Sequence, residues 1–120
     1  HDMSTIRGWW EENAHQTQAF YNQILGQSGK APQFCEADIN KAIVMQHLYA
    51  PAMWSTFQLQ DLLGSDADLR RQNPNDERIN VPANPSHYWQ YRMHMTLENL
   101  LEQDSFNSEL HSCIVASGRA

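Results

Sequence analysis

Residues 52–60 have the sequence AMWSTFQLQ, and the centre of this stretch decides which fold the sequence predicts. Met53–Gln58 is rich in aromatic and other side chains that favour strands, so we predict a β-strand there. A single strand leaves backbone donors and acceptors unpaired along both of its edges. We therefore expect this strand to pair with neighbours from outside the 120 residues, and the chain to be a piece of something longer.

Helical patterns lie on both sides of the predicted strand, because apolar side chains recur there at helical spacing. A break near Asn13 is expected inside the first helix. Between the strand and the C-terminal helices, residues 65–85 are polar and include three prolines, which is the composition of a long ordered loop. Long loops inside compact domains are often functional. The predicted helices are residues 4–25, 37–49, 95–101 and 105–117, with a short helical turn over DLLG, residues 61–64.

The composition excludes several classes of function. The 120 residues are 41% hydrophobic and 18% charged, with a net charge of −6, and the eight basic residues do not cluster. Nucleic acid is therefore not an expected partner. No apolar run approaches the roughly 18 residues that a membrane helix needs. The two cysteines, Cys35 and Cys113, lack metal-site spacing and suggest no disulfide framework, so we expect a reducing compartment.

A histidine and an aspartate stand together at the first two positions, His1 and Asp2. Metal-dependent phosphohydrolases also use a His-Asp pair, but they need further histidine and aspartate ligands on nearby helices. The other histidines show no such pairing, and His47 falls on an apolar helix face, where a core position is expected. We therefore predict no metal site and no cofactor.

Residues 77–101, ERINVPANPSHYWQYRMHMTLENLL, combine amides with crowded aromatic rings. Asn80 and Asn84 offer both hydrogen-bond donors and acceptors. Sugar sites use such amides beside rings, since apolar sugar faces stack on aromatics. The alternative, favoured by these residues alone, is that the rings clamp a long loop onto the body. The rings concerned are Tyr88, Trp89 and Tyr91.

Three stretches in order, HDMSTIRGWWEE (1–12), FQLQDLLG (57–64) and residues 77–101, together resemble the 4-α-glucanotransferases, also called amylomaltases or disproportionating enzymes. The likeness is to the branch that includes the plant cytosolic enzyme and bacterial relatives. It extends to about residue 118. One departure is Gln90, where this branch often carries a basic residue.

The resemblance implies an α/β fold, the (β/α)8 TIM barrel. Residues 1–120 would be the C-terminal part of its catalytic barrel, from the end of strand seven through the last helix, with the upstream part missing. Within this part the chain would be mostly helical, with one principal strand near residues 53–58. The TIM-barrel rim is where catalytic residues lie.

The resemblance also implies an activity: transfer of α-1,4-glucan segments between maltodextrin or other glucan chains by a retaining mechanism. Asp2 would be the third catalytic carboxylate and stabilise the transition state, and His1 would bind the reacting sugar. Asn80 is the other predicted substrate-binding residue. Both carboxylates of the retaining mechanism would lie upstream, so this chain alone is expected to be inactive. A cytoplasmic location and a maltooligosaccharide substrate are expected.

A different class of function is a non-catalytic helical interaction module. Its partner contacts would come from the four tryptophans of the chain, which are Trp9, Trp10, Trp54 and Trp89. A nucleophilic aspartate and an acid/base glutamate upstream of His1 in the gene would favour the transferase, and a start codon directly before His1 would favour the module.

Overall fold

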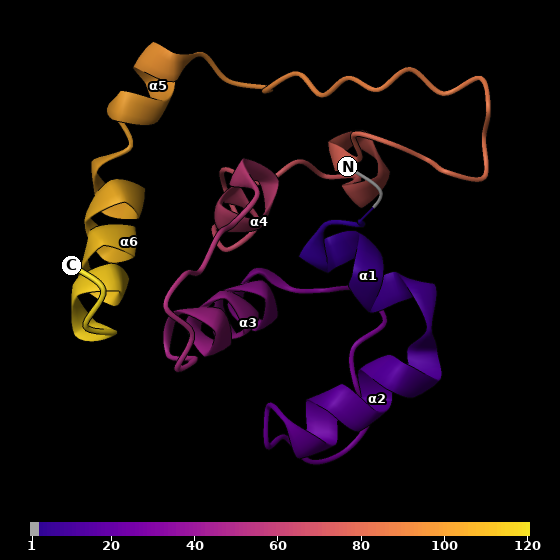
Figure 1. Cartoon of the computed structure of the whole chain (residues 1–120), viewed down its shortest axis with the longest axis horizontal. Coiled ribbons are helices and arrows are strands. Elements are labelled where there is room, and N and C mark those ends of the chain that lie inside the picture. Colours follow the sequence, from indigo (N-terminus) through magenta and orange to yellow (C-terminus); the bar gives the residue numbers. More distant parts are fainter. Residues whose placement is uncertain (1–2) are drawn as a thin grey trace.

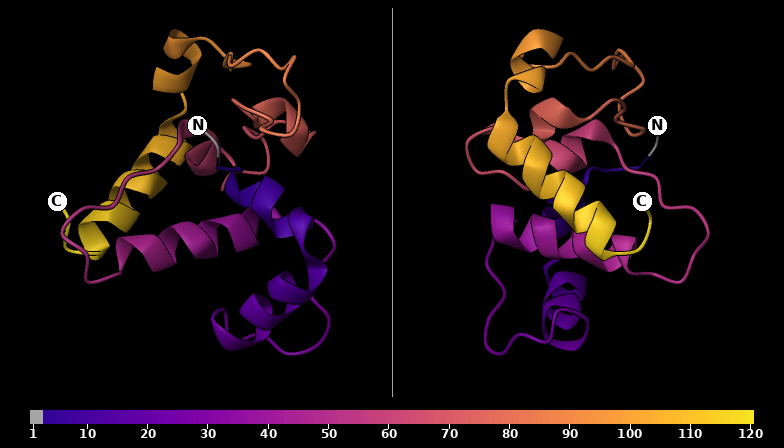
Figure 2. Two further views of the ribbon diagram at one scale, coloured as in Figure 1. Left: turned by 45° about the vertical axis from the view of Figure 1, so that its right-hand side comes forward. Right: turned by 90° about the vertical axis from the view of Figure 1, so that its left-hand side faces the viewer.

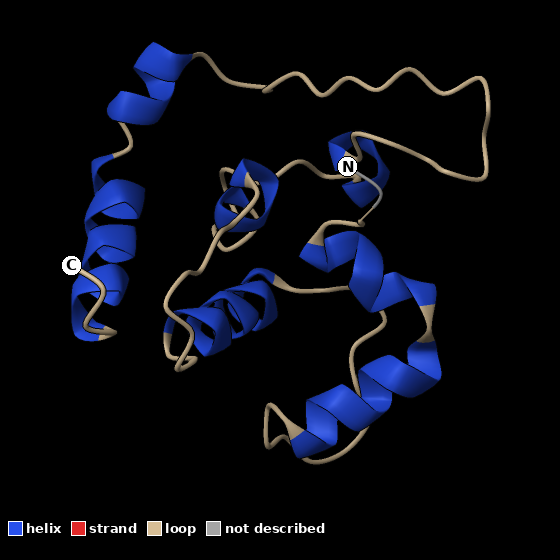
Figure 3. Ribbon diagram, in the orientation of Figure 1, coloured by secondary structure: helices blue, strands red, loops and turns tan. Residues whose placement is uncertain are grey.

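A computed structural model describes residues 3–120, and its regular structure is helical (Figures 1 and 3). His1 and Asp2 lie outside the described residues. The elements are α1 (Ile6–Glu12), α2 (Ala14–Gln23), α3 (Ala37–Leu48), α4 (Leu59–Leu63), the 3-10 helix η1 (Pro74–Glu77), α5 (Leu97–Leu101) and α6 (Asp104–Ala116). Helices α1 to α4 lie within residues 6–63, and α5 and α6 lie within residues 97–116. The segment between these two groups contains the 3-10 helix η1 and a long loop.

The predicted strand at residues 53–58 is wrong, and with it the α/β fold class: residues 3–120 contain no strand. Met53 and Trp54 are 88% and 80% exposed, so no described segment packs against them. The carbonyls just before them bind the side chain of Arg119, whose Nη2 donates to the oxygens of Ala50 and Ala52 at 2.9 and 3.0 Å. Strand propensity expresses packing against neighbouring strands, and the described chain supplies none.

The predicted break near Asn13 is confirmed. Asn13 ends α1 in an extended conformation and caps α2, because its side-chain oxygen accepts from the backbone N–H groups of His15 and Gln16 at 3.1 Å. Thr5 caps α1 in the same way through Gly8. Asparagine and threonine are preferred at such positions because they satisfy N–H groups that lack a partner within the helix. The helix predicted at 37–49 is confirmed as α3.

The core of the N-terminal half is built around Trp10, which is 1% exposed and lies beside Cys35 and Ile43. The indole Nε1 donates to the Pro32 oxygen at 2.9 Å, so the loop before α3 is fixed to α1. Trp10 and Tyr21 meet edge to face, with ring centroids 6.3 Å apart. Buried Trp10 therefore joins α1, α2 and α3.

The accessible surface area of the molecule is larger than that expected for a folded monomer of its mass. Its accessible area is 8245 Å², against about 6,700 Å² for a folded monomer of this mass. The loop between η1 and α5 runs along one edge, away from α2 (Figures 1 and 2).

Among residues 3–120, no helix is long and apolar enough to cross a membrane. Exposed large apolar side chains include those of Met3, Phe34, Met53, Trp54, Tyr88, Trp89, Leu97 and Leu101.

Gly64, at the end of α4, has a close approach that only glycine permits. A Cβ there would lie 2.8 Å from Oδ1 of Asn40, which is fully buried. In the full-length protein we expect Gly64→Ala to destabilise the α3–α4 region by about 1–3 kcal/mol through overpacking. Hydrogen exchange of peptides from α3 and α4 measures this.

The matched control is Gly8→Ala in α1, where the added Cβ would meet its nearest atom at an ordinary 3.4 Å. This change should be neutral or stabilising by up to about 1 kcal/mol, since alanine is the better helix former. Equal exchange in the two variants would show that the Gly64 approach is not restrictive.

Candidate functional site

The structure describes one of the three predicted site residues. Asn80 lies in the loop after η1, and its side chain is 5% exposed. The predicted catalytic residue Asp2 and the predicted sugar-binding residue His1 lie outside the described residues. The backbone that follows them leads directly into α1. The roles of all three residues remain predictions, but the structure shows how α1 and the Asn80 loop are held together.

A buried ion pair connects α1 to the segment before Asn80. Nη1 of Arg7 donates to Oε1 of Glu77 at 2.7 Å, and the two side chains are 8% and 3% exposed. The same guanidinium donates to two backbone carbonyls, those of Arg71 at 2.6 Å and Gln72 at 3.1 Å. One side chain of α1 thus holds the segment before η1 as well as the last residue of η1.

The short helix α4 makes hydrogen bonds to both of the elements that the ion pair connects, α1 and η1. Nε2 of Gln60 donates to the backbone oxygen of Glu77 at 3.1 Å. Oδ1 of the next residue, Asp61, accepts from the N–H of Ile6 at 2.8 Å and so satisfies the first residue of α1. Both α4 side chains are buried. A carboxylate at a helix N-terminus is favourable because that end carries a partial positive charge.

We call Arg7, Gln60, Asp61 and Glu77 the buried polar cluster. Its members come from the three stretches that carry the family resemblance: Arg7 from residues 1–12, the α4 pair from 57–64, and Glu77 from 77–101. Sequence analysis did not select them. The available signal was a charged residue, Arg7, close to three large apolar residues (Ile6, Trp9 and Trp10), since a buried charge requires a partner.

Burial dominates the electrostatics of the cluster. It raises the pKa of Glu77, and the nearby positive charge and hydrogen bond of Arg7 oppose this rise. Burial likewise raises the pKa of Asp61, and the hydrogen bond from Ile6 opposes it. The second carboxylate oxygen of Glu77, Oε2, is buried without a hydrogen-bond partner. The cluster is therefore costly to assemble, as buried ionic groups generally are.

The far end of the Asn80 loop is fixed by polar contacts more than by stacked rings. Nη2 of Arg71 donates to the Arg92 oxygen, and the guanidinium carbon lies 5.6 Å from the centre of the Tyr91 ring. Nε2 of His94 lies 2.6 Å from the Leu69 oxygen. Tyr91 takes part in this anchoring through its contact with Arg71, whereas Tyr88 and Trp89 are 80% and 60% exposed.

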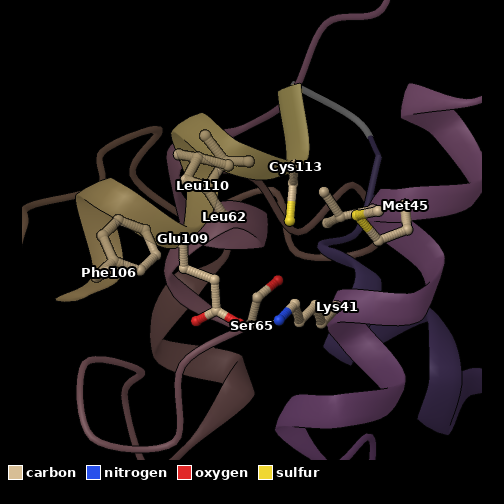
Figure 4. Close-up of a pocket in the computed structure, with 9 residues that line it drawn as sticks. Lys41, Met45, Leu62, Ser65, Phe106, Glu109, Leu110 and Cys113 are labelled. Carbon is tan, nitrogen blue, oxygen red and sulfur yellow. Dashed lines mark hydrogen bonds and ion pairs between the residues drawn. The ribbon is translucent and has the colours of Figure 1, made fainter. Parts of the chain in front are cut away.

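A cavity between α3, α4 and α6 is separate from these residues. Figure 4 shows Lys41 and Glu109 pointing toward one another across it, and they form an ion pair. Its volume of about 30 Å³ suffices for a water molecule or two but not for a sugar ring. Asn80, the one predicted site residue that the structure describes, does not line it.

Two other chemistries find no support in the described part of the chain. Residues 3–120 contain no group of three histidine, cysteine or acidic residues that could hold a metal ion. Burial raises the pKa of the Cys35 thiol to about 12, against the opposing charges of Arg70 and Arg7. Since the thiolate is the nucleophilic form, burial disfavours Cys35 as a nucleophile at neutral pH.

Comparison with known proteins decides the family. Residues 1–97 match the family described as 4-alpha-glucanotransferase. The chain belongs to the 4-alpha-glucanotransferase family. The resemblance stated from the three stretches is therefore confirmed, and the buried polar cluster belongs to a chain of this family.

Individual relatives in this family match nearly the whole chain. It is 38% identical over 120 residues to the 4-alpha-glucanotransferase DPE2 of Oryza sativa subsp. japonica. It is 30% identical over 111 residues, 92% of its length, to the 4-alpha-glucanotransferase of Chlamydia caviae. The chain spans only 13% and 20% of these two relatives. No solved structure matches it.

Proposed function

We propose that the protein containing these residues is a 4-α-glucanotransferase, which transfers α-1,4-glucan segments between maltooligosaccharide or longer glucan chains. The observation that carries the proposal is the family match over residues 1–97, together with the rice relative that aligns over all 120 residues. Residues 1–120 would then be a C-terminal part of the catalytic domain. The excess accessible surface supports a place within a larger protein.

Within this proposal, Asp2 stabilises the transition state of a retaining reaction. Such a transition state resembles an oxocarbenium ion, and a fixed carboxylate near it lowers the barrier. His1 and Asn80 bind hydroxyl groups of the sugar. The nucleophile and the acid/base, which the mechanism needs about 5 Å apart, belong to the rest of the full-length protein. Residues 1–120 alone are therefore inactive.

The test is incubation of the purified full-length protein with maltotriose. A glucanotransferase forms glucose and, in parallel, glucans longer than maltotriose, because the cleaved segment is passed to another sugar. Chromatography of the products separates the possibilities. Maltose and glucose without longer chains would indicate hydrolysis instead, and unchanged maltotriose would favour the interaction module. The isolated 120-residue chain is the negative control.

A further inference from the structure

The Arg7–Glu77 ion pair joins two segments that carry predicted site residues. Arg7 follows Asp2 by five positions, and Asn80 follows Glu77 by three. We infer that this ion pair is a positioning device: it fixes α1, and the chain leading into it from His1 and Asp2, against the Asn80 loop. Arg7 and Glu77 are then positioning residues that contact no substrate. The inference rests on the proposed glucanotransferase function.

Arg7 holds the chain on both sides of η1, the helix that precedes the Asn80 loop. Its acceptors are the oxygens of Arg71 and Gln72 before η1 and the Glu77 carboxylate at its end, at 2.6 to 3.1 Å. A guanidinium is planar, and its donors have fixed directions, so several acceptors define its orientation as well as its distance. The segment 71–77 cannot shift relative to α1 without breaking these bonds.

The α4 helix supplies a second restraint in another direction. Asp61 holds the first N–H of α1, and Gln60 holds the backbone oxygen of Glu77. Because these contacts come from consecutive residues of one helix, α1 and the end of η1 are tied to the same rigid element. Sliding of the Asn80 loop along α1 would break contacts to α4 as well as to Arg7.

Stability alone does not account for an ion pair at this depth. Well-packed apolar side chains in place of a buried ion pair are often neutral or stabilising, because charges are costly to remove from water. What apolar side chains cannot supply is a fixed direction. Rates respond to such geometry, since a misplacement of about 1 Å can lower turnover by about 10²-fold. A stabilising role and a positioning role therefore predict different results when both residues are made apolar. A stabilising role predicts a loss of stability, and a positioning role predicts a loss of turnover in a folded protein.

The test uses the full-length protein carrying Arg7→Met and Glu77→Leu together. We expect its kcat for maltotriose disproportionation to fall by about 10²-fold, with KM changed by less than about threefold and the melting temperature within a few degrees of the parent. The single variant Glu77→Gln keeps an oxygen acceptor for Arg7, so its kcat should fall less, by roughly tenfold. The matched control is Lys41→Met with Glu109→Leu, which removes the half-exposed ion pair between α3 and α6.

Control activity should equal that of the parent. A folded double variant with parental kcat overturns the inference, and so does a kcat loss that merely follows the loss of folded protein. If the double variant does not fold, parental kcat in Glu77→Gln overturns it. Hydrogen exchange of residues 71–80 gives a readout independent of activity. It should rise at least about tenfold in either folded variant and not in the control; unchanged exchange overturns the inference. If the unmodified full-length protein is inactive, the proposed function is refuted but the positioning inference is not. Hydrogen exchange of residues 71–80 then decides whether the ion pair holds the Asn80 loop.

Discussion

In the full-length protein, Asp2→Asn should lower the turnover of maltotriose disproportionation by about 10²–10³-fold. Asparagine keeps the size of the side chain and removes its negative charge. In the proposed role of Asp2, the negative charge matters most when positive charge develops on the reacting sugar, so the interaction would be made mainly in the transition state. KM should therefore change far less than kcat. Steady-state rates of glucose release from maltotriose measure both constants.

His1→Ala is the companion variant for this experiment. A hydrogen bond to a sugar hydroxyl exists in both the bound substrate and the transition state, so its loss should raise KM as well as lower kcat, and by less than the loss from Asp2→Asn. An Asp2→Asn protein with near-parental turnover would remove the catalytic assignment, even if the family activity itself were demonstrated.

Trp10→Ala should cause the largest loss of stability in the N-terminal half. The ring is almost fully buried, and its Nε1 binds the Pro32 oxygen at 2.9 Å. Truncation leaves a cavity among α1, α2 and α3, which costs about 3–5 kcal/mol. The loss also leaves the Pro32 carbonyl without this donor. Hydrogen exchange of peptides from residues 6–48 in the full-length protein should accelerate by roughly 10²–10⁴-fold where it follows local opening.

Trp9→Ala is the matched control, because the same residue type precedes Trp10 in the same helix. Trp9 is half-buried and meets Phe20 edge to face, with centroids 5.3 Å apart. Its truncation should cost less than half as much. Similar exchange rates in the two variants would show that Trp10 does not hold the three helices together.

Local patterns predicted the helices well. Apolar spacing located α3, and the polar stretch EENAHQTQ between two apolar groups placed the break near Asn13, because both signals depend on residues close in sequence. Met53–Gln58 was predicted wrongly for the opposite reason. A strand requires hydrogen-bond partners from other segments, and the described chain directs the Ala50 and Ala52 carbonyls to Arg119 instead.

The site was predictable only in part. The quoted stretches were sufficient to recognise the family, and residues 1–97 match it. The pairing of Arg7 with Glu77 was not predictable, since 70 positions separate them and the sequence around neither residue identifies its partner. A buried Arg7 implies a partner for its charge. Whether Arg7 is buried, however, depends on how α4 and η1 pack against α1.

The buried polar cluster also limits how this protein can be recombined with its relatives. Its four members lie on three separate elements, α1, α4 and η1, which they join through hydrogen bonds between specific atoms. A crossover between residues 12 and 59 would combine the α1 of one parent with the α4 and η1 of another. Unless both parents carry compatible groups at these positions, such a chimera encloses a charge without its counterpart. Residues 6–77 are therefore best exchanged between members of this family as one block, even where the loops between the contacting residues have diverged.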